Sequence, residues 1–336
     1  AVLGIAAGAL GVLTFQSVAR KSHRLDAGGS DWRKVNLILK CMDENYVDAI
    51  DHKKVTDEVA SAALSALDPH SVYMLPQTLE STEESLAGNF DGIGIQFNVP
   101  NDTAVVIEVI PGGPSEKIGL RPGDRLLKVD SVNIAGVRFP QDSMVRRIKG
   151  KAGSKVRLTV RRGDEDIPFE ITRDKIPTHS VDAAFMVDDT TGYLRLSKFS
   201  RTSDREVAVA ASALLASGMT SLVMDLRDNT GGFLDQALSL SNMFLHKDEQ
   251  IVYMEGAHRK RQDFKADGHG MMQDIRLRLL INEGTASSSE ILAGALQDNG
   301  RATIVGRRSF GKGLVQEPFY FTDGSGMRIT VARFYT

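Results

Sequence analysis

Cysteine is almost absent from this sequence of 336 residues, which contains Cys41 alone. A single thiol cannot form an intramolecular disulfide, and it has no second thiolate with which to build a metal site. The sequence therefore excludes a disulfide-stabilised fold and a cysteine-based zinc site. Cys41 itself is expected to be a buried apolar side chain.

An excess of charge of either sign is also missing, because 41 Lys and Arg residues face 43 Asp and Glu residues, for a net charge of −2. A protein that coats phosphate backbones needs a positive excess, so no nucleic-acid partner is expected. The content of 42% hydrophobic and 25% charged residues is that of an ordinary globular protein and excludes a collagen-like or largely unfolded chain. The length favours two folded units and a short appendage.

Charge is missing altogether from residues 1–19, which are rich in Ala, Gly, Val and Leu and are followed by Arg20 and Lys21. Their length fits either a spanning helix or the apolar part of a signal peptide. A buried N-terminal helix is the alternative, but soluble helices seldom run this far without a polar face. Residues 1–19 are therefore predicted to be a signal or anchor segment. The basic residues after this segment favour a cytoplasmic flank, whereas an exported protein needs the opposite. The orientation of the segment in the membrane is therefore inferred from the rest of the chain.

Residues 30–75 carry helical periodicity. Apolar side chains recur three and four positions apart in two runs, which predicts two amphipathic helices between Trp32 and Leu67, arranged as a hairpin. Asp51 can cap the second helix, and Asp68-Pro69 can end it, because the residue before proline disfavours the helical region.

The periodicity then changes. Residues 88–174 contain short alternating runs separated by Gly, Pro, Asn and Asp, which predict a β-rich domain with one helix from Gln141 to Lys149. In residues 175–336 strands alternate with helices, which implies a layered α/β core. A charged loop is expected between His258 and His269. The predicted fold class is α/β plus β: a layered α/β core with an inserted small β domain and an N-terminal helical hairpin.

Three segments of the α/β part contain residue types suited to catalysis. In the first, Asp225 to Gly232, a strand ends in two glycines just before a helix. Free backbone amides at a helix start can donate hydrogen bonds to a developing oxyanion. A plain strand-to-helix turn, or a phosphate loop, is the alternative interpretation.

The second segment contains Ser287, Ser288 and Ser289 between an apolar strand and an amphipathic helix. A serine at this position has small neighbours and nearby amides, as a nucleophile needs. The structural alternative is a helix capping box, since Ser287 and Glu290 have the required spacing.

The third segment, Ser309 to Gln316, places Lys312 between two glycines just before a strand. Close packing of this backbone would bury the amine, and burial lowers the pKa of a lysine, which makes a neutral general base. A Walker loop is excluded, because Arg307 stands where it needs glycine and Gly313 where it needs Ser or Thr. A solvated surface lysine is the alternative.

The segments TASSSEI and SFGKGLVQ, with LDPHSVY at residues 67–73, resemble the carboxy-terminal processing proteases of peptidase family S41, and the resemblance spans most of the chain. It implies a serine endopeptidase with a Ser287/Lys312 dyad, in which Gln316 orients the lysine and no metal or other cofactor is required. The implied oxyanion donors are the amides of Gly232 or Gly231 and of Ser288. The sequence departs from the family at Ser288, where alanine is usual and where the added hydroxyl has no assigned role, and at Asp228-Asn-Thr in the oxyanion loop.

The β-rich domain resembles a PDZ domain in DGIGI at residues 91–95 followed by PSEKIGLRPGD. Taken alone, GIGI would be a tight turn into a strand. The resemblance implies that a peptide C-terminus adds as a strand, with its carboxylate held by the loop of Gly92, Ile93, Gly94 and Ile95. It also suggests the hypothesis that tail binding repositions the domain and aligns the dyad, with the basic stretch at residues 146–149 as the coupling element or simply a solvated face.

The predicted domains are a signal or anchor segment at residues 1–19, a helical region at 30–75, a PDZ domain at 88–174 and a protease core at 175–336 that is expected to continue further. Expected partners are proteins and peptides with free C-termini, the membrane, and by family analogy a second copy in a homodimer or higher oligomer. The expected location is the bacterial cell envelope, in the periplasm, with or without anchoring in the inner membrane.

Two other functions fit the sequence less well. A histidine-based triad is disfavoured because no GxSxG elbow accompanies the seven histidines. A non-catalytic PDZ scaffold or adaptor is disfavoured because an inactive descendant has no reason to keep Ser287, Lys312 and Gln316 together.

Overall fold

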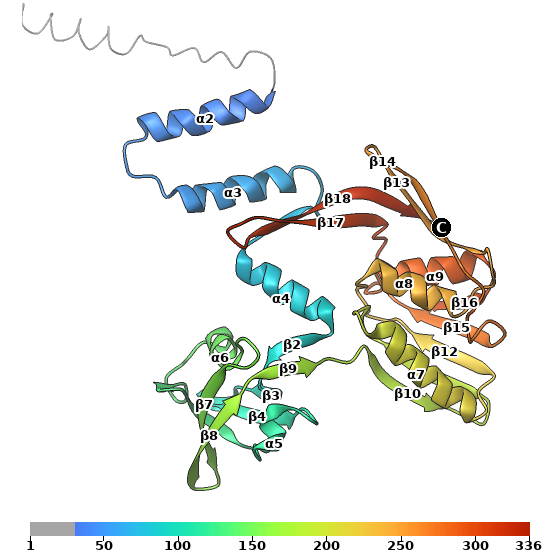
Figure 1. Ribbon diagram of the computed structural model, residues 1–336, viewed down its shortest axis with the longest axis horizontal. Helices are drawn as coiled ribbons and strands as arrows, with labels where there is room; N and C mark the ends of the chain where they lie inside the picture. Colours follow the sequence, from blue (N-terminus) through green and yellow to red (C-terminus); the bar gives the residue numbers. More distant parts are fainter. Residues whose placement is uncertain (1–30) are drawn as a thin grey trace, which may run out of the picture. The chain divides into compact units, whose positions relative to one another are not determined.

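The computed structural model describes residues 31–336 (Figure 1). Residues 1–30, and with them the predicted signal or anchor segment at residues 1–19, lie outside the described residues. Within residues 31–336, no helix has the combination of length and apolar character needed to span a membrane. The chain divides into two compact units, residues 1–62 and 63–336.

The first unit contains the helices expected from the periodicity, α2 (Asp31–Asn45) and most of α3 (His52–Ser65). The predicted cap is confirmed, because Asp51 Oδ1 accepts the backbone N–H of Lys54 at 3.1 Å. The expectation of a buried cysteine is wrong, since Cys41 is only partly buried. Two short helices can enclose few side chains, and Ile38 is accordingly 50% exposed.

Helix α4 (Pro76–Ala87), which the sequence did not predict, follows the short strand β1 (Val72–Met74). Pro76 suits the first helical turn, and Gly88 ends the helix with a left-handed φ of 76°. The next strand, β2 (Asn89–Gly92), pairs with β9 (Asp174–Pro177), so the chain enters and leaves the β-rich domain side by side.

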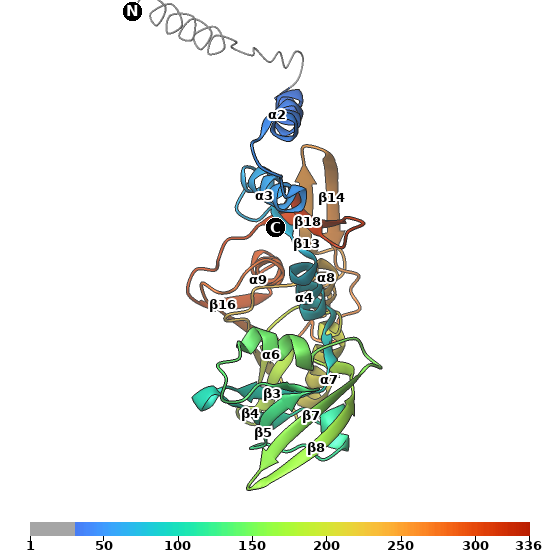
Figure 2. The same ribbon diagram turned by 90° about the vertical axis from the view of Figure 1, so that its left-hand side faces the viewer.

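The β-rich domain is an antiparallel sheet with strand order β3-β4-β5-β7-β8, and β6 pairs with β5. The predicted helix is confirmed as α6, which buries Met144 and Ile148. Figure 2 shows α6 beside β3, the strand at the edge of this sheet. The elements are β3 (Ile95–Asn98), η1 (Pro100–Asp102), β4 (Ala104–Val109), α5 (Pro114–Lys117), β5 (Arg125–Val129), β6 (Val132–Asn133), α6 (Gln141–Ile148), β7 (Lys155–Arg162) and β8 (Glu165–Thr172).

The predicted α/β layer is also confirmed. Its sheet has the order β10-β11-β12-β15-β16, and all neighbours are parallel except β10 and β11. Helix α7 packs on β10 and β11, and α9 packs on β16 (Figure 1). Phe199, Leu222 and Leu240 are fully buried in the core between these elements. The elements are β10 (Val181–Met186), β11 (Thr191–Leu196), α7 (Ser203–Ala216), β12 (Ser221–Asp225), α8 (Leu234–Asn242), β15 (Arg276–Ile281), α9 (Ser288–Asp298) and β16 (Ala302–Gly306).

A second sheet is built around the long strand β18 (Gly326–Tyr335), which pairs with β1, β13 (Gln250–Gly256) and β17 (Leu314–Tyr320). The charged loop expected between His258 and His269 is wrong, because Arg259–Lys265 forms strand β14, paired with β13. An exposed edge strand can be charged throughout, so its sequence lacks the apolar alternation that reveals a strand.

Candidate active site

Two loops meet at the carboxyl edge of the α/β sheet. Residues 226–233 join β12 to α8, and residues 282–287 join β15 to α9. Because β12 and β15 are parallel neighbours, both loops leave the sheet at the same edge, where ligands of such sheets usually bind. The Ala286 N–H donates to the Asn229 carbonyl oxygen at 3.0 Å and joins the loops directly.

Ser287 lies at the end of the second loop, directly before α9. Its φ of 55° is a left-handed value that non-glycine residues seldom adopt and that is concentrated at functional sites. The turn is fixed from the sheet side, since Thr285 Oγ1 donates to the Leu226 carbonyl oxygen at 2.8 Å. The surrounding structure therefore imposes the backbone conformation that presents Ser287.

Gly231 and Gly232 lie against this serine. A Cβ on Gly231 would stand 2.9 Å from the Ser287 Cβ and 2.8 Å from the Ser288 nitrogen, and a Cβ on Gly232 would overlap the Phe199 carbonyl oxygen. Both glycines also have φ in the left-handed range, 94° and 154°. Only glycine allows this loop to approach so closely.

The backbone amides at this contact differ in availability. The Gly231 N–H donates to Asn229 Oδ1 at 2.9 Å and is already used. For Gly232 and Ser288, no acceptor of the backbone N–H is found within residues 31–336. Of the three predicted oxyanion donors, Gly232 and Ser288 are therefore the two that can donate to a ligand.

Lys312 lies in the loop between β16 and β17, half-buried. Its Nζ donates to Gln316 Oε1 at 3.0 Å, and Gln316 Nε2 donates to the His70 carbonyl oxygen. Burial lowers the pKa of Lys312, and the nearby charge of Arg328 lowers it further, whereas Asp68 acts in the opposite direction. The environment thus favours the neutral amine that a general base requires.

Glu290, on the first turn of α9, connects the serine and lysine segments. The capping box, given above as the structural alternative for this segment, is present, with Glu290 Oε2 accepting the Ser287 N–H at 2.9 Å. The same oxygen accepts the Lys312 N–H at 2.8 Å. Its other oxygen, Oε1, accepts from Ser309 Oγ at 2.7 Å and from the Gly311 N–H at 2.6 Å. One carboxylate therefore holds the backbones of Ser287 and Lys312 within two hydrogen-bond lengths of each other.

The sequence predicted Glu290 only as a helix cap and did not foresee its bonds to the lysine loop. It also missed the His70 carbonyl oxygen, because a backbone acceptor leaves no signature in residue type. Within residues 31–336, no hydrogen bond joins Ser287 Oγ to Lys312 Nζ, and the amine is bound to Gln316 instead.

The glycine loop of the β-rich domain borders a groove of about 250 Å³ between β3 and α6. Its lining includes Val145 and Ile148 of α6 and the whole segment Gly92–Phe97. Neither Ile93 nor Gly94 donates its N–H to an acceptor within residues 31–336. Because β3 is an edge strand with these free amides at its start, the groove can accept an added strand and a terminal carboxylate.

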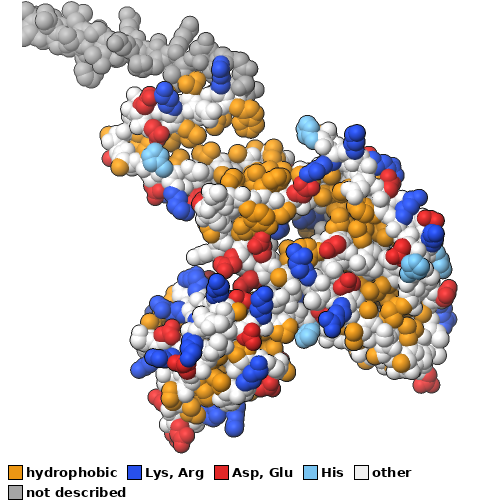
Figure 3. Space-filling view, viewed as in Figure 1, with side chains coloured by type: hydrophobic (Ala, Val, Ile, Leu, Met, Phe, Trp, Pro, Cys, Tyr) orange, Lys and Arg blue, Asp and Glu red, His pale blue; other side chains and the backbone are white. Residues whose placement is uncertain are grey.

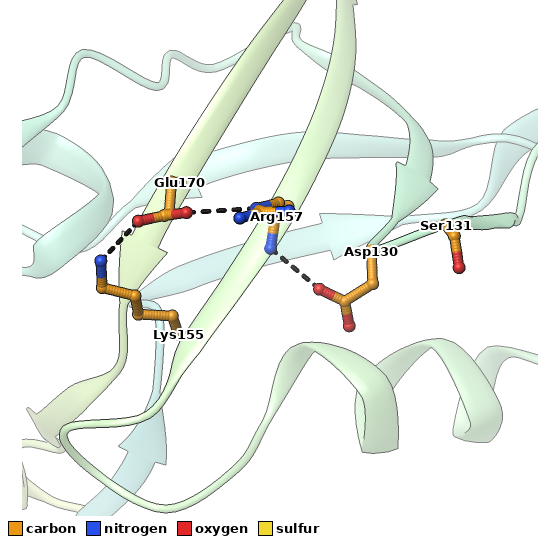
Figure 4. Close-up of a pocket in the computed structure, with 5 residues that line it drawn as sticks. All are labelled: Asp130, Ser131, Lys155, Arg157 and Glu170. Atoms are coloured by element: carbon orange, nitrogen blue, oxygen red, sulfur yellow. Dashed lines mark hydrogen bonds and ion pairs between the residues drawn. The ribbon is translucent and has the colours of Figure 1, made fainter.

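A second depression of this domain, shown in Figure 4, is a poorer candidate for a ligand-binding site. Glu170 lies between Lys155 and Arg157 and binds them at 2.6 and 3.1 Å, and Asp130 Oδ1 accepts the Arg157 N–H at 3.0 Å. Its charges are thus already paired at an exposed surface. On the face seen in Figure 3, Lys and Arg alternate with Asp and Glu over this domain. Among the described residues, no group of three or more His, Cys, Asp and Glu could hold a metal ion.

Comparison with known proteins agrees with this architecture. The model of peptidase family S41 matches residues 190–336, and that of the PDZ domain matches residues 92–172. The carboxy-terminal processing protease CtpA of Bacillus subtilis is 32% identical over 92% of this chain and 66% of its own length. A probable CtpA-like serine protease of Staphylococcus haemolyticus is 31% identical, over 94% and 64%. The chain thus spans slightly less than two thirds of the length of these relatives.

Two solved structures share the fold. The photosystem II D1 C-terminal processing protease is 28% identical with a TM-score of 0.53, over 92% of this chain and 83% of that one. A putative S41 protease from Bacteroides fragilis has the same TM-score at 18% identity and covers 94% of this chain and 87% of its own. At this identity the likeness supports only the fold assignment. Fold and site define a serine-peptidase architecture that carries a PDZ domain. Residues 190–336 belong to peptidase family S41 and residues 92–172 to the PDZ domains, as the sequence segments predicted, and the chain as a whole is similar to carboxy-terminal processing proteases.

Proposed function

We propose that this chain is a serine endopeptidase that cleaves peptide bonds with Ser287 as nucleophile and Lys312 as general base. The observation that supports this most strongly is the Glu290 carboxylate, which binds the backbone N–H groups of both residues. Two further observations agree: the free amides of Gly232 and Ser288 beside the serine, and the lowered pKa of the half-buried Lys312. A purely structural capping box needs the bond from Glu290 to the Ser287 N–H, but not the bond to the Lys312 N–H, the free amides or the lowered pKa.

In the proposed reaction, neutral Lys312 takes the hydroxyl proton of Ser287 while the serine oxygen attacks the substrate carbonyl carbon. The carbonyl oxygen becomes an oxyanion that accepts hydrogen bonds from Gly232 and Ser288. Collapse of the intermediate breaks the C–N bond, and Lys312 returns the proton to the leaving amine. Water then attacks the acyl-enzyme, releases the new carboxyl terminus and restores Ser287.

Gln316 has the role of holding the Lys312 amine in this proposal. Its Oε1 accepts from the amine, and its Nε2 is fixed on the His70 carbonyl oxygen. The amine has to reach Ser287 Oγ once substrate is bound, and catalytic hydrogen bonds are commonly long or unformed without substrate.

The proposed substrates are proteins with free C-terminal tails, bound at the PDZ groove of β3 and α6. The free amides of Ile93 and Gly94 suit the terminal carboxylate, and the lining of Val145 and Ile148 suits an apolar last side chain. From the uncharged residues 1–19 we also propose action in the bacterial cell envelope, in the periplasm, with membrane attachment through that segment. Assembly as a homodimer or higher oligomer belongs to the same proposal.

Cleavage of an unstructured protein with an apolar C-terminal tail tests the proposal. Wild type is expected to cut, and Ser287→Ala and Lys312→Ala are each expected to lose at least about 10³-fold in kcat while still binding the tail. Undiminished cleavage by Ser287→Ala would refute the nucleophile. Tail binding by a wild type that never cuts would favour the non-catalytic scaffold.

A further inference from the structure

The three consecutive serines at the start of α9 make different contacts. Ser287 is the proposed nucleophile, whereas Ser288 and Ser289 are buried and their hydroxyls are directed to the loop of residues 226–233. Ser289 Oγ donates to the Asn229 carbonyl oxygen at 2.9 Å. Ser288 Oγ donates to the carbonyl oxygens of Gly232 and Phe233, at 2.9 and 3.2 Å.

The Ser288 contact involves both free amides of the site. One proposed oxyanion donor is the N–H of Ser288 itself, and the other is the N–H of Gly232, whose carbonyl the Ser288 hydroxyl binds. A hydrogen bond to that carbonyl restrains the φ and ψ angles of a glycine that otherwise has more freedom than any other residue. One side chain therefore sets the position of one donor relative to the other.

Ser288 has no substitute in this role. Within residues 31–336, no other hydrogen-bond donor contacts the Gly232 carbonyl oxygen. The Asn229 carbonyl oxygen, by contrast, also accepts the Ala286 N–H, so the loss of the Ser289 hydroxyl leaves it with a partner. Removal of the Ser288 hydroxyl leaves the Gly232 carbonyl oxygen without a donor among the described residues, so that Gly232 is held through its neighbours, by the bonds of Phe199 N–H to Gly231 and of Phe233 N–H to Phe199.

We infer that Ser288 is a positioning residue, whose hydroxyl fixes the Gly232 amide for oxyanion binding. This inference rests on the proposed function, because it assumes that Gly232 and Ser288 donate to an oxyanion. An oxyanion hole is effective because its donors are aligned before charge develops, and loss of one donor typically costs about 10²–10³ in kcat. A donor that is present but no longer fixed should cost less, about 10-fold.

The experiment compares Ser288→Ala with Ser241→Ala, a matched control. Ser241 is also fully buried, and its hydroxyl has no hydrogen-bond partner among the described residues, so its loss removes a buried oxygen without touching the site. For each variant we would measure kcat, KM, the melting temperature, and the affinities of a peptide aldehyde and of the matching peptide amide. The aldehyde adds to Ser287 to give a tetrahedral oxygen that needs the oxyanion hole, whereas the amide binds without it.

Ser288→Ala is expected to lower kcat and aldehyde affinity about 10-fold each, with KM and amide affinity within about 2-fold of wild type. Ser289→Ala should lose only about 3-fold, and Ser288→Cys, which keeps the volume and a weak donor, should fall between wild type and Ser288→Ala. If Ser288→Ala is too unstable to assay, Ser288→Cys takes its place in the same comparison.

Equal kcat and equal aldehyde affinity in Ser288→Ala and Ser241→Ala would overturn the inference. So would equal losses of aldehyde and amide affinity, because these indicate a general disturbance of the site. Ser287→Ala, assayed in parallel, separates the two proposals: if it cuts normally the proposed function fails, and if it is inactive while Ser288→Ala is unimpaired, only the role of Ser288 fails.

Discussion

The peptide groove and the proposed catalytic site both use free backbone amides, but they are built differently. In the groove, the amides of Ile93 and Gly94 begin an edge strand and face a lining dominated by apolar side chains of α6. At the catalytic site, the free amides of Gly232 and Ser288 are surrounded by loops that side-chain hydrogen bonds join at several points.

The difference follows from what each site has to bind. A groove that accepts an added strand recognises the main-chain atoms of many tails. The bound peptide itself becomes ordered as the added strand, so the groove need not be fully fixed beforehand. A site that stabilises a short-lived oxyanion gains only from donors that are already aligned. Substitutions at the catalytic site should therefore change kcat by large factors, and substitutions in the groove should change tail affinity by smaller ones.

Among substitutions outside the proposed dyad, the largest effect is expected from Glu290→Gln. The carboxylate accepts four hydrogen bonds, and an amide would turn an NH2 group toward two of those donors. We expect kcat to fall about 100-fold because the serine and lysine segments separate, with tail binding unchanged. Glu283→Gln is the matched control, since that side chain is 68% exposed and pairs with Arg307. Equal kcat values for the two variants would show that Glu290 does not align the dyad.

A smaller effect is expected in the groove from Val145→Asp. This substitution places a carboxylate in the apolar lining, near the expected position of the substrate's terminal carboxylate. We expect KM for a tailed substrate to rise about 10-fold, and KM for the same substrate with an amidated C-terminus to stay unchanged. Arg146→Gln, on the exposed side of α6, makes the same change in net charge and should leave both KM values alone. A rise in both KM values for Val145→Asp would contradict tail recognition at this groove.

The pH dependence of cleavage tests the environment of Lys312. Its pKa lies below the ordinary lysine value, so the neutral amine and the acylation rate should both increase as the pH rises toward that pKa. Arg328→Met removes a positive charge that lowers this pKa. The pKa should therefore rise, and the rising limb of the kcat/KM profile should move to higher pH. An unmoved limb, or a move to lower pH, would mean that another group controls the profile.

The smallest effect is expected at the edge of the groove, where Lys149 pairs with Glu84 of α4 at 2.7 Å. Lys149 lines the groove, so its charge can also attract a terminal carboxylate. Half-exposed ion pairs are weak, and changes of about 2- to 4-fold are expected. Tail affinity, measured by peptide titration, should fall in Lys149→Met and rise in Glu84→Gln, which frees the lysine. A change of the same sign in both variants would exclude this competition.

The sequence predicted the parts of the fold that carry a clear period. The alternation of strands and helices predicted the α/β layer, and the helix predicted from Gln141 to Lys149 is α6. It failed where tertiary contacts replace periodicity, as in α4, which lacks a regular apolar stripe, and in the charged edge strand Arg259–Lys265. The resemblance to known segments located Ser287 and Lys312, because their residue types are characteristic.

The connections between the site residues could not be predicted in the same way. The Ser287–Glu290 spacing indicated a cap, yet the bonds of Glu290 to Gly311 and Lys312 depend on how a distant loop folds back. The hydroxyl of Ser288 had no predicted role, because its acceptor is a backbone carbonyl far along the chain. Such contacts join loops that only the folded sheet brings together.

The most direct test of the dyad is to locate the acyl group during turnover. A peptide ester would be mixed with excess enzyme, quenched in acid and mapped by mass spectrometry, in wild type and in Lys312→Ala. We expect an acyl group on Ser287 in wild type and a rate of acylation at least about 10³-fold lower in Lys312→Ala. An acyl group on another residue, or undiminished acylation of Ser287 without the lysine, would contradict the proposed dyad.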